Sequence, residues 1–410
     1  MTLPMAGMRV LSMEQAAALP FATRHFADLG AEVIRMQSHR RGPGAVLDAI
    51  GTRNKLQLAL DLSVPGGSEA FLAVADNCDV VAHNFTPRVV RKFGIDYEAV
   101  KALKDDVIYV SLTGFGTTGP WGERPLFGPG AEAMSGQNLL IGTQGGFSPG
   151  RPGTITYADN ICGLNTAFAV LAALDERDRT GSGQHIDVTL YETAVSQIGV
   201  AVTERAFGAP LPERVGNHDH AFALHGVFDA AGTDRHIAIA ATDEQLPAAL
   251  TALAVDSIDG IADAIAAEQA ETSVERLQAA GVAASVVADA SDTASDAHLW
   301  DRGTFAPVFT EQGPLPAMGP AWGGSADISE GVPMQAGRHV GADTRDVLGR
   351  IGGLDKAAID ELFESGVAGE LLPQGTPGAL PAPQVAIDRG ELARVDDQFS
   401  GWQLAQERSQ

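Results

Sequence analysis

The stretch GMRVLSMEQAAALPFATRHFADLGAEVIRM, residues 7–36, decides the fold of this 410-residue chain. Its first part, MRVLSM (8–13), predicts a short strand, and EVIRM (32–36) predicts a second one. Between them, PFATRHFADLG (20–30) predicts a helix with a proline near its start and a glycine at its end. Strand, helix and strand in this order are typical of the unit from which parallel sheets are built.

The same alternation continues along the next eighty residues. Further strands are predicted at LQLALDL (56–62), DVVAHN (79–84) and DVIYVSL (106–112), with helices at SEAFLAVADN (68–77) and over 97–104. Beyond residue 154 we expect a long helix, followed by a strand and a helix in QHIDVTLYETAVSQI (184–198). The pattern predicts the α/β class, with a doubly wound, Rossmann-like parallel sheet whose ligands lie at the carboxyl ends of its strands.

The texture of the sequence changes after this region, which predicts a second, smaller α+β domain. The polar loop RVGNHDH (214–220) is followed by a short β-rich stretch and then by Ala-rich amphipathic helices. The last forty residues are rich in proline, glycine and polar side chains. We therefore expect a large α/β domain over 1–205, a smaller domain over 206–325, a return segment over 326–370 and a C-terminal tail over 371–410.

Composition narrows the classes of partner. The formal net charge of -24 argues against nucleic acid or an anionic membrane, since both need a basic face. A small anionic ligand needs only a local cluster of cations, and the sequence offers three: His39-Arg40-Arg41, Arg53 with Lys55, and Arg88 with Arg91 and Lys92. No apolar run is long enough for a membrane span and no secretory signal is visible, so we expect a cytoplasmic protein. Cys78 and Cys162 are expected to be buried, reduced thiols.

Three familiar patterns fail on inspection. GFGTTG (114–119) matches a dinucleotide-binding turn, but PWGERP follows it where a helix should begin. GFSPG (146–150) would make Ser148 a hydrolase nucleophile, but Pro149 lacks the backbone N–H that an oxyanion hole needs. His218-Asp219-His220 has no second cluster with ligand spacing, and we expect no metal.

Taken together, the segments resemble a known family over about residues 7–365. Residues 7–36 are followed, in order, by NKLQLALDL (54–62), HNFTPRVVRKFGIDYEAV (83–100), VSLTGFGTTGPW (110–121) and TGSGQHIDVTLYETAV (180–195). Their order and spacing resemble the class III CoA-transferases, which include formyl-CoA, carnitine and bile-acid-inducible CoA-transferases and have α-methylacyl-CoA racemase as a relative. The resemblance implies an acyl-CoA substrate, a small carboxylic acid as acceptor, no metal, and a homodimer of interlocked chains.

The resemblance also implies a nucleophile. In these enzymes an aspartate opening a long helix rich in small residues attacks the thioester, and Asp159 in TITYADNICGLNTAFAVLAAL (154–174) matches it. A carboxylate held close to a thioester carbonyl can form a mixed anhydride, and the dipole of the following helix favours its negative charge. Backbone N–H groups of the glycine-rich loop 142–150 are candidate oxyanion donors.

Coenzyme A contacts are implied at three places: the loop after the first strand, the basic stretch after the second strand, and an Asn-Phe pair with a basic residue downstream. In this chain the corresponding residues are Gln15, Ala16 and Ala17; Arg40 or Arg41; and Asn84, Phe85 and Lys92. Arginine suits a phosphate because its planar fork binds two oxygens.

Two alternatives stay open. In the racemase relatives a His-Asp pair moves the α-proton, but the matching residues here are Phe127 and Gly128, neither of which is a base, while Glu132 lies nearby in sequence. Gly128 also suggests an unusually open acceptor pocket. The other alternative is a non-catalytic subunit of a hetero-oligomeric transferase, against which the presence of Asp159 argues.

Overall fold

A computed structural model describes residues 3–40, 51–143, 145–146, 156–210, 214–310, 313–319, 334–371 and 400–409. The chain forms two compact units. The first comprises Met1–Gln137, Arg151–Val200 and Ser295–Gln410, and the second comprises Asn138–Gly150 and Ala201–Ala294. Among the described residues, no helix is long and apolar enough to cross a membrane.

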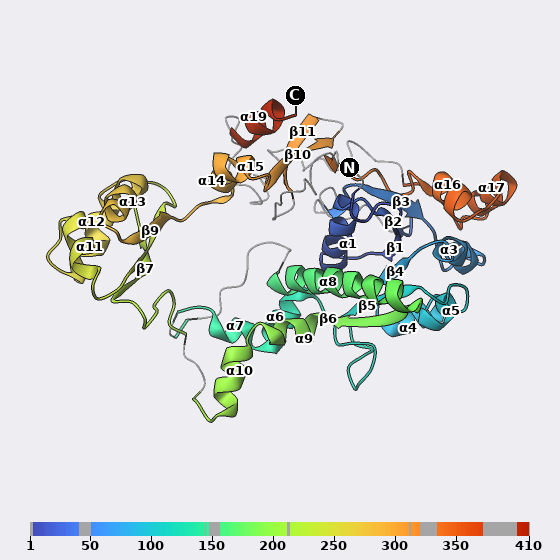
Figure 1. The fold of residues 1–410 in the computed structure, drawn as a ribbon, viewed down its shortest axis with the longest axis horizontal. Coiled ribbons are helices and arrows are strands. Elements are labelled where there is room, and N and C mark those ends of the chain that lie inside the picture. The colour runs from blue at the N-terminus through green and yellow to red at the C-terminus, as the bar shows by residue number, and fades with distance from the viewer. Residues whose placement is uncertain are drawn as a thin grey trace. The chain divides into compact units, whose positions relative to one another are not determined.

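The first unit is built on a parallel sheet of six strands (Figure 1). Its order is β3-β2-β1-β4-β5-β6, which confirms the mixed α/β fold with a parallel central sheet. The sheet grows outward in both directions from the adjacent pair β1 and β4, so the strand order reverses between these two strands. The strands are β1 (Arg9–Met13), β2 (Glu32–Gln37), β3 (Lys55–Ala59), β4 (Val80–His83), β5 (Ile108–Thr113) and β6 (Gln184–Thr189).

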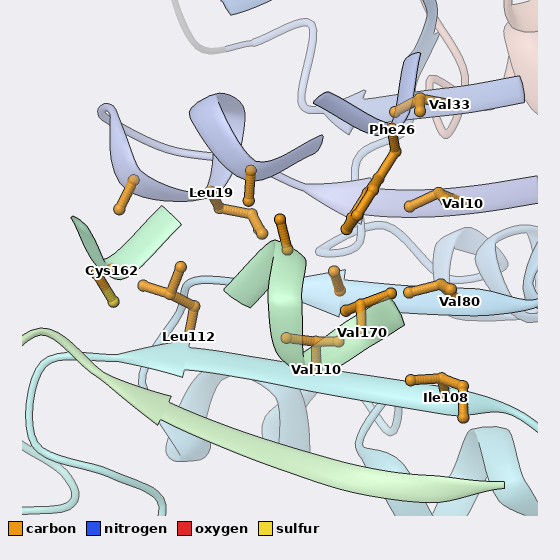
Figure 2. Packing of buried hydrophobic residues seen from close by; sticks show 14 of the residues in the cluster. Val10, Leu19, Phe26, Val33, Val80, Ile108, Val110, Leu112, Cys162 and Val170 are labelled. Carbon is orange, nitrogen blue, oxygen red and sulfur yellow. The ribbon is translucent and has the colours of Figure 1, made fainter. Parts of the chain in front are cut away.

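Helices cover both faces of this sheet because successive side chains along each strand point to opposite faces. On one face, α1 (Ala18–Asp28) and α8 (Tyr157–Thr180) pack on the sheet, with Phe26 and Val170 against Val10 and Val80 (Figure 2). On the other face, Leu11 packs in a second cluster that includes Phe71 of α3 (Gly67–Ala75). Both Cys78 and Cys162 are buried, free thiols, as predicted.

Shorter elements complete the first unit. The helices are α4 (Pro87–Lys92), α5 (Tyr97–Lys101), α6 (Gly128–Ser135), α9 (Leu190–Ser196), α15 (Ala297–Asp301), α16 (Thr344–Asp346), the π-helical turn η2 (Val347–Ile351), α17 (Lys356–Glu364) and α19 (Ser400–Glu407). A small sheet in the order β11-β10-β12 contains β10 (Phe305–Thr310), β11 (Gly313–Met318) and β12 (Met334–Gln335). Helices α7 (Gln137–Leu140) and α10 (Gly199–Ala206) occur where the chain passes between the units.

The second unit has its own sheet and its own core. Strands β7 (Leu224–Asp229), β8 (His236–Ala241) and β9 (Ala283–Val286) pair antiparallel in that order. Its helices are α11 (Leu246–Leu253), the 3-10 turn η1 (Ile258–Gly260), α12 (Ile261–Ala266), α13 (Ala270–Ala279) and α14 (Ala290–Ala294). Ile237, Ile239 and Leu277 lie in one buried cluster, so this unit buries apolar surface of its own.

Candidate active site

Asp159 lies in the first turn of α8, the 24-residue helix that packs on α1. Thr156 is the N-cap: its hydroxyl oxygen accepts from the Asp159 backbone N–H at 3.4 Å and donates to Asp159 Oδ2 at 2.8 Å. The spacing Thr-x-x-Asp, which resembles a capping box, is the sequence signal that could have identified Thr156. The helix N-terminus thus places a carboxylate where backbone dipoles favour negative charge.

The surroundings of Asp159 make its charge costly. The residue is 6% exposed. Burial raises the pKa of the Asp159 carboxyl above its ordinary value, and the negative charge of Glu132 adds to that rise. Hydrogen bonds from the Thr156 hydroxyl and the Thr156 backbone N–H oppose it. A carboxylate with a raised pKa is more basic, and hence a better nucleophile, than one in water.

Glu132 of α6 caps the same helix N-terminus. Its Oε1 accepts from the backbone N–H of Tyr157 at 2.8 Å and of Ala158 at 3.4 Å. Glu132 is 2% exposed. Its carboxylate is therefore engaged with the backbone of α8 rather than presented as a base for a substrate proton.

Gly128, one turn before Glu132 on α6, does not create an opening. A Cβ atom built at Gly128 would lie 2.8 Å from Asp159 Cγ, and closer still to Asp159 Oδ2 and Thr156 Oγ1. The space directly beside Gly128 is filled by the hydrogen-bonded pair of Asp159 and Thr156, and the openness of the acceptor pocket as a whole stays a prediction.

The residues expected to contact coenzyme A lie partly together. Gln15 follows β1 and Asn84 follows β4, and these two strands are neighbours. The Asn84 side chain makes two hydrogen bonds to the backbone of Gln15: Oδ1 accepts from the Gln15 N–H at 2.9 Å, and Nδ2 donates to the Gln15 carbonyl at 2.6 Å. Ala16 next to it adopts a φ of 52°. The amide of Asn84 thus shapes the loop Gln15, Ala16 and Ala17.

Phe85 is fixed by a chain of polar side chains that the sequence analysis missed. Its backbone N–H donates to His83 Nδ1 at 3.2 Å, which leaves the proton of that ring on Nε2. Nε2 lies 2.9 Å from Ser111 Oγ, which lies 2.9 Å from His185 Nε2. Burial lowers the pKa of His83 to about 3, so the ring is neutral at physiological pH. These residues stand on β4, β5 and β6, and only their parallel pairing brings them into one line.

The basic clusters behave differently from one another. Arg40 Nε pairs with Asp61 Oδ2 at 2.9 Å while its side chain stays largely exposed, and Lys92 lies at the end of α4 with Nζ 5.2 Å from the Phe93 ring centroid. Arg41 lies outside the described residues. Both cations are thus exposed to solvent: Arg40 lies after the carboxyl end of β2, and Lys92 lies at the end of α4, the helix that follows β4.

Arg53 and Lys55 are not available to a ligand phosphate. Both are buried: Arg53 pairs with Asp28, and Lys55 Nζ lies 3.0 Å from both oxygens of Glu14. The interpretation of this pair as an anion-binding cluster was therefore wrong. Their charges are neutralised inside the fold between α1, β1 and β3.

The remaining motifs have different outcomes. Residues 114–127, all of them described, contain no helix, so GFGTTG is not followed by the helix N-terminus that a dinucleotide-binding turn needs. Ser148 lies outside the described residues, as does most of loop 142–150; of its described part, the Gly146 N–H donates to the Thr143 carbonyl. Within the described ranges, no group of three or more His, Cys, Asp or Glu side chains is arranged to hold a metal ion.

Comparison with known sequences identifies the class of protein. The sequence profile described as "CoA-transferase family III" matches residues 5–339, and the chain belongs to that family. It is 27% identical to mouse succinyl-CoA:glutarate CoA-transferase, over 89% of this chain and 90% of that protein. It is 32% identical to succinyl-CoA:mesaconate CoA-transferase of Haloarcula hispanica, over 72% and 83%.

Other similarities extend over different lengths. The chain is 33% identical to the beta subunit of succinyl-CoA--L-malate CoA-transferase of Chloroflexus aurantiacus, and the match covers 61% of this chain and 64% of that subunit. A solved CAIB/BAIF family protein from Brucella suis matches 86% of this chain and 100% of its own, with a TM-score of 0.78 and 23% identity. At that identity the structural likeness supports the fold alone.

Proposed function

We propose that this protein moves coenzyme A from an acyl-CoA thioester to a free carboxylic acid, with Asp159 as the covalent nucleophile. The observation that carries the proposal is the buried Asp159 carboxylate at the start of α8, which accepts a hydrogen bond from the Thr156 hydroxyl and has a raised pKa. The membership of family III supports the class of reaction.

The reaction consists of four acyl transfers. An Asp159 oxygen attacks the donor thioester carbonyl, the C–S bond breaks, and coenzyme A leaves as thiolate from a mixed anhydride. The thiolate then attacks the aspartyl carbonyl and expels the donor acid as carboxylate. The acceptor carboxylate attacks the resulting aspartyl thioester and releases the thiolate again. In the last step the thiolate attacks the acceptor's carbonyl, and Asp159 leaves as a free carboxylate.

Coenzyme A is proposed to bind at the carboxyl ends of β1 and β4, where the strand order reverses. The Gln15–Ala17 loop that Asn84 shapes would lie along it, with Phe85 at its side and Lys92 and Arg40 facing the phosphates. This placement follows the general rule that ligands of doubly wound sheets bind at the carboxyl ends of strands, at the point where the strand order reverses. Arg41, which is outside the described residues, is the alternative to Arg40.

The substrates are proposed to be a succinyl-type thioester and a dicarboxylic acid. The relatives above carry names that combine succinyl-CoA with glutarate, mesaconate or L-malate. Racemisation is the weaker alternative, because Phe127 and Gly128 lack a basic group and Glu132 is occupied by the N–H groups of α8. A non-catalytic subunit is the other alternative, since two C. aurantiacus relatives are named as the alpha and beta subunits of succinyl-CoA--L-malate CoA-transferase.

The functional protein is proposed to be a homodimer. Leu164, Phe168 and Leu171 follow one another at helical spacing on α8 and are exposed on the single chain, with Phe168 75% exposed. Contiguous exposed apolar side chains of this kind mark protein interfaces. A second copy of this chain is the proposed occupant, interlocked as expected from the family resemblance. Three other expectations likewise stay predictions: the smaller domain over 206–325, the role of the large domain in binding coenzyme A, and the cytoplasmic location.

The test is mass spectrometry of peptides from protein incubated with succinyl-CoA and other acyl-CoAs, with and without hydroxylamine. We expect an Asp159 hydroxamate that requires acyl-CoA, and a fall in turnover on the order of 10⁴-fold in Asp159→Asn. Asp175→Asn, at an exposed position of the same helix, is the matched control and should keep full activity. Unlabelled Asp159 with every donor would refute the covalent mechanism, and α-proton exchange in heavy water would then favour the racemase alternative.

A further inference from the structure

Two residues of α6 contact the N-terminus of α8 from the same side. Gly128 and Glu132 are four residues apart and both are buried, so they occupy one face of that helix. Each meets a different part of the first turn of α8. Gly128 lies against the side chains of Thr156 and Asp159, whereas Glu132 binds the backbone of Tyr157 and Ala158.

Gly128 is required by close approach and not by its backbone. Its φ is not in the left-handed region, so another residue type would fit the backbone conformation at the start of α6. A side chain would not fit, because a Cβ atom would overlap the hydrogen bond that joins Thr156 Oγ1 to Asp159 Oδ2. Both atoms belong to groups fixed on the first turn of α8, and neither is the end of a long flexible side chain. Any substitution at 128 therefore displaces the carboxylate.

Glu132 binds N–H groups at the start of α8 that would otherwise need another acceptor. The first N–H groups of a helix lack intrahelical partners, and an acidic residue in the first turn often binds them. Here Glu132 accepts from the first two, and Thr156 accepts from the third. Among the described residues, the Asp159 carboxylate still interacts with its own N-cap residue: Oδ2 accepts from the Thr156 hydroxyl at 2.8 Å, and the Thr156 backbone N–H also lowers the pKa of the carboxyl. The N–H groups of Tyr157 and Ala158 are bound by Glu132 instead.

We infer that Gly128 and Glu132 are positioning residues for Asp159: the bare Cα of Gly128 provides the space in which the carboxylate lies, and Glu132 binds the first two N–H groups of α8 so that the carboxylate does not have to. The inference rests on the proposed function, in which Asp159 is the nucleophile. Gly128 stands at one of the two positions, with Phe127, where the racemase relatives carry a His-Asp pair, and Glu132 lies one turn further along α6.

Glu132 is also the charged group that acts on Asp159. Among the described residues it is the one charge that raises the pKa of Asp159, in addition to burial, and the Cys162 thiol one turn further along α8 stays protonated because burial raises its pKa to about 12. The other titratable side chains on elements packed against α8 do not contribute to that shift: Arg24, His25 and Asp28 of α1, Glu192 of α9, and His185 and Asp187 of β6.

The first experiment compares Gly128→Ala with Gly130→Ala, using the single-turnover rate of Asp159 acylation by succinyl-CoA. A Cβ at Gly130 meets the end of the flexible Leu126 side chain, so that variant is the control on the same helix. Gly128→Ala should lower the acylation rate on the order of 100-fold, the loss expected from a misplacement of about 1 Å, with an unchanged melting temperature. Equal rates in the two variants would overturn the role of Gly128.

The second experiment compares Glu132→Gln with Glu132→Ala. The amide oxygen of glutamine still accepts from the Tyr157 N–H, so Glu132→Gln should acylate roughly 10-fold faster than Glu132→Ala, in line with one buried hydrogen bond. Loss of the charge should lower the pKa of Asp159 in both variants. Because the deprotonated carboxylate is the nucleophile, the increase of the acylation rate with pH should then occur at lower pH than in the wild type. A purely structural role would not move that limb, so an unshifted pH profile would overturn the inference.

A third measurement does not depend on activity. Titration of protein labelled with ¹³Cγ-aspartate, with the Asp159 resonance assigned through Asp159→Asn, should give a lower Asp159 pKa in Glu132→Gln than in the wild type. Equal pKa values would overturn the role of Glu132 even if the transferase reaction proceeds. If the wild type is never acylated but the pKa falls as expected, the proposed function fails while the placement of Glu132 beside Asp159 stands.

Discussion

Replacing Glu14 with glutamine should destabilise the sheet unit strongly, because Glu14 is the counter-charge of a buried cationic group. Its side chain and that of Lys55 are fully buried, and Lys55 Nζ lies 3.0 Å from both carboxylate oxygens. Arg35 Nε lies 3.5 Å from Oε2, and the Ser12 hydroxyl donates to Oε1 at 2.7 Å. Glutamine has nearly the same shape but removes the carboxylate that neutralises the buried Lys55 ammonium.

The expected loss in the free energy of unfolding is about 3–5 kcal/mol at pH 7, the cost of removing one partner of a buried ion pair. Urea denaturation followed by circular dichroism measures it. Glu123→Gln is the matched control, since Glu123 pairs with Arg91 at the surface, with about half of each side chain exposed. Loss of an exposed pair should cost no more than about 1 kcal/mol. Equal losses in the two variants would refute the reasoning.

The pH dependence gives a second check on Glu14. Burial lowers the pKa of Lys55 to about 8, against the opposing effect of Glu14. Without Glu14 that pKa falls further, so the folded variant releases the Lys55 proton at a lower pH than the wild type does. Stability rises with pH wherever the unfolded state binds more protons than the folded state. The deficit of Glu14→Gln should therefore narrow as the pH rises towards 8, and a constant deficit would contradict this account.

Two further predictions concern the coenzyme A loop and the dimer. Asn84→Ala removes both hydrogen bonds to the Gln15 backbone and should raise the Kd for coenzyme A roughly 10-fold by isothermal titration calorimetry, while Asn77→Ala, at an exposed position, should not. An unchanged Kd in Asn84→Ala would show that the Gln15–Ala17 loop does not contribute to coenzyme A binding. Phe168→Glu should shift a dimer towards monomer in light scattering, whereas Leu103→Glu, at an exposed position outside α8, should leave it intact; a wild-type monomer would refute the dimer.

Much of the fold could be predicted from local pattern. Strands and helices between residues 8 and 113 follow hydrophobic periodicity, which depends on near neighbours in the chain. Asp159 could be placed at the start of a helix for the same reason, since mostly small and apolar residues continue after it for about four turns, as far as Leu174. Asn84 and Gln15 could each be named as site residues, but not as partners of one another. Their contact exists because β1 and β4 are neighbours in the sheet, and sequence order gives no such adjacency.

The sequence by itself determined the strand-and-helix alternation, the class of transferase that its motifs resemble, and a carboxylate at a helix start. Only the tertiary structure decided the surroundings of that carboxylate, with Glu132 as a cap for α8 and Gly128 against Asp159. It also decided that Arg53 and Lys55 pair inside the fold with Asp28 and Glu14. The physical reason is the distance along the chain over which each effect acts. Periodicity and capping are set within a few residues, whereas burial and charge at a site depend on side chains brought together by packing from distant parts of the chain.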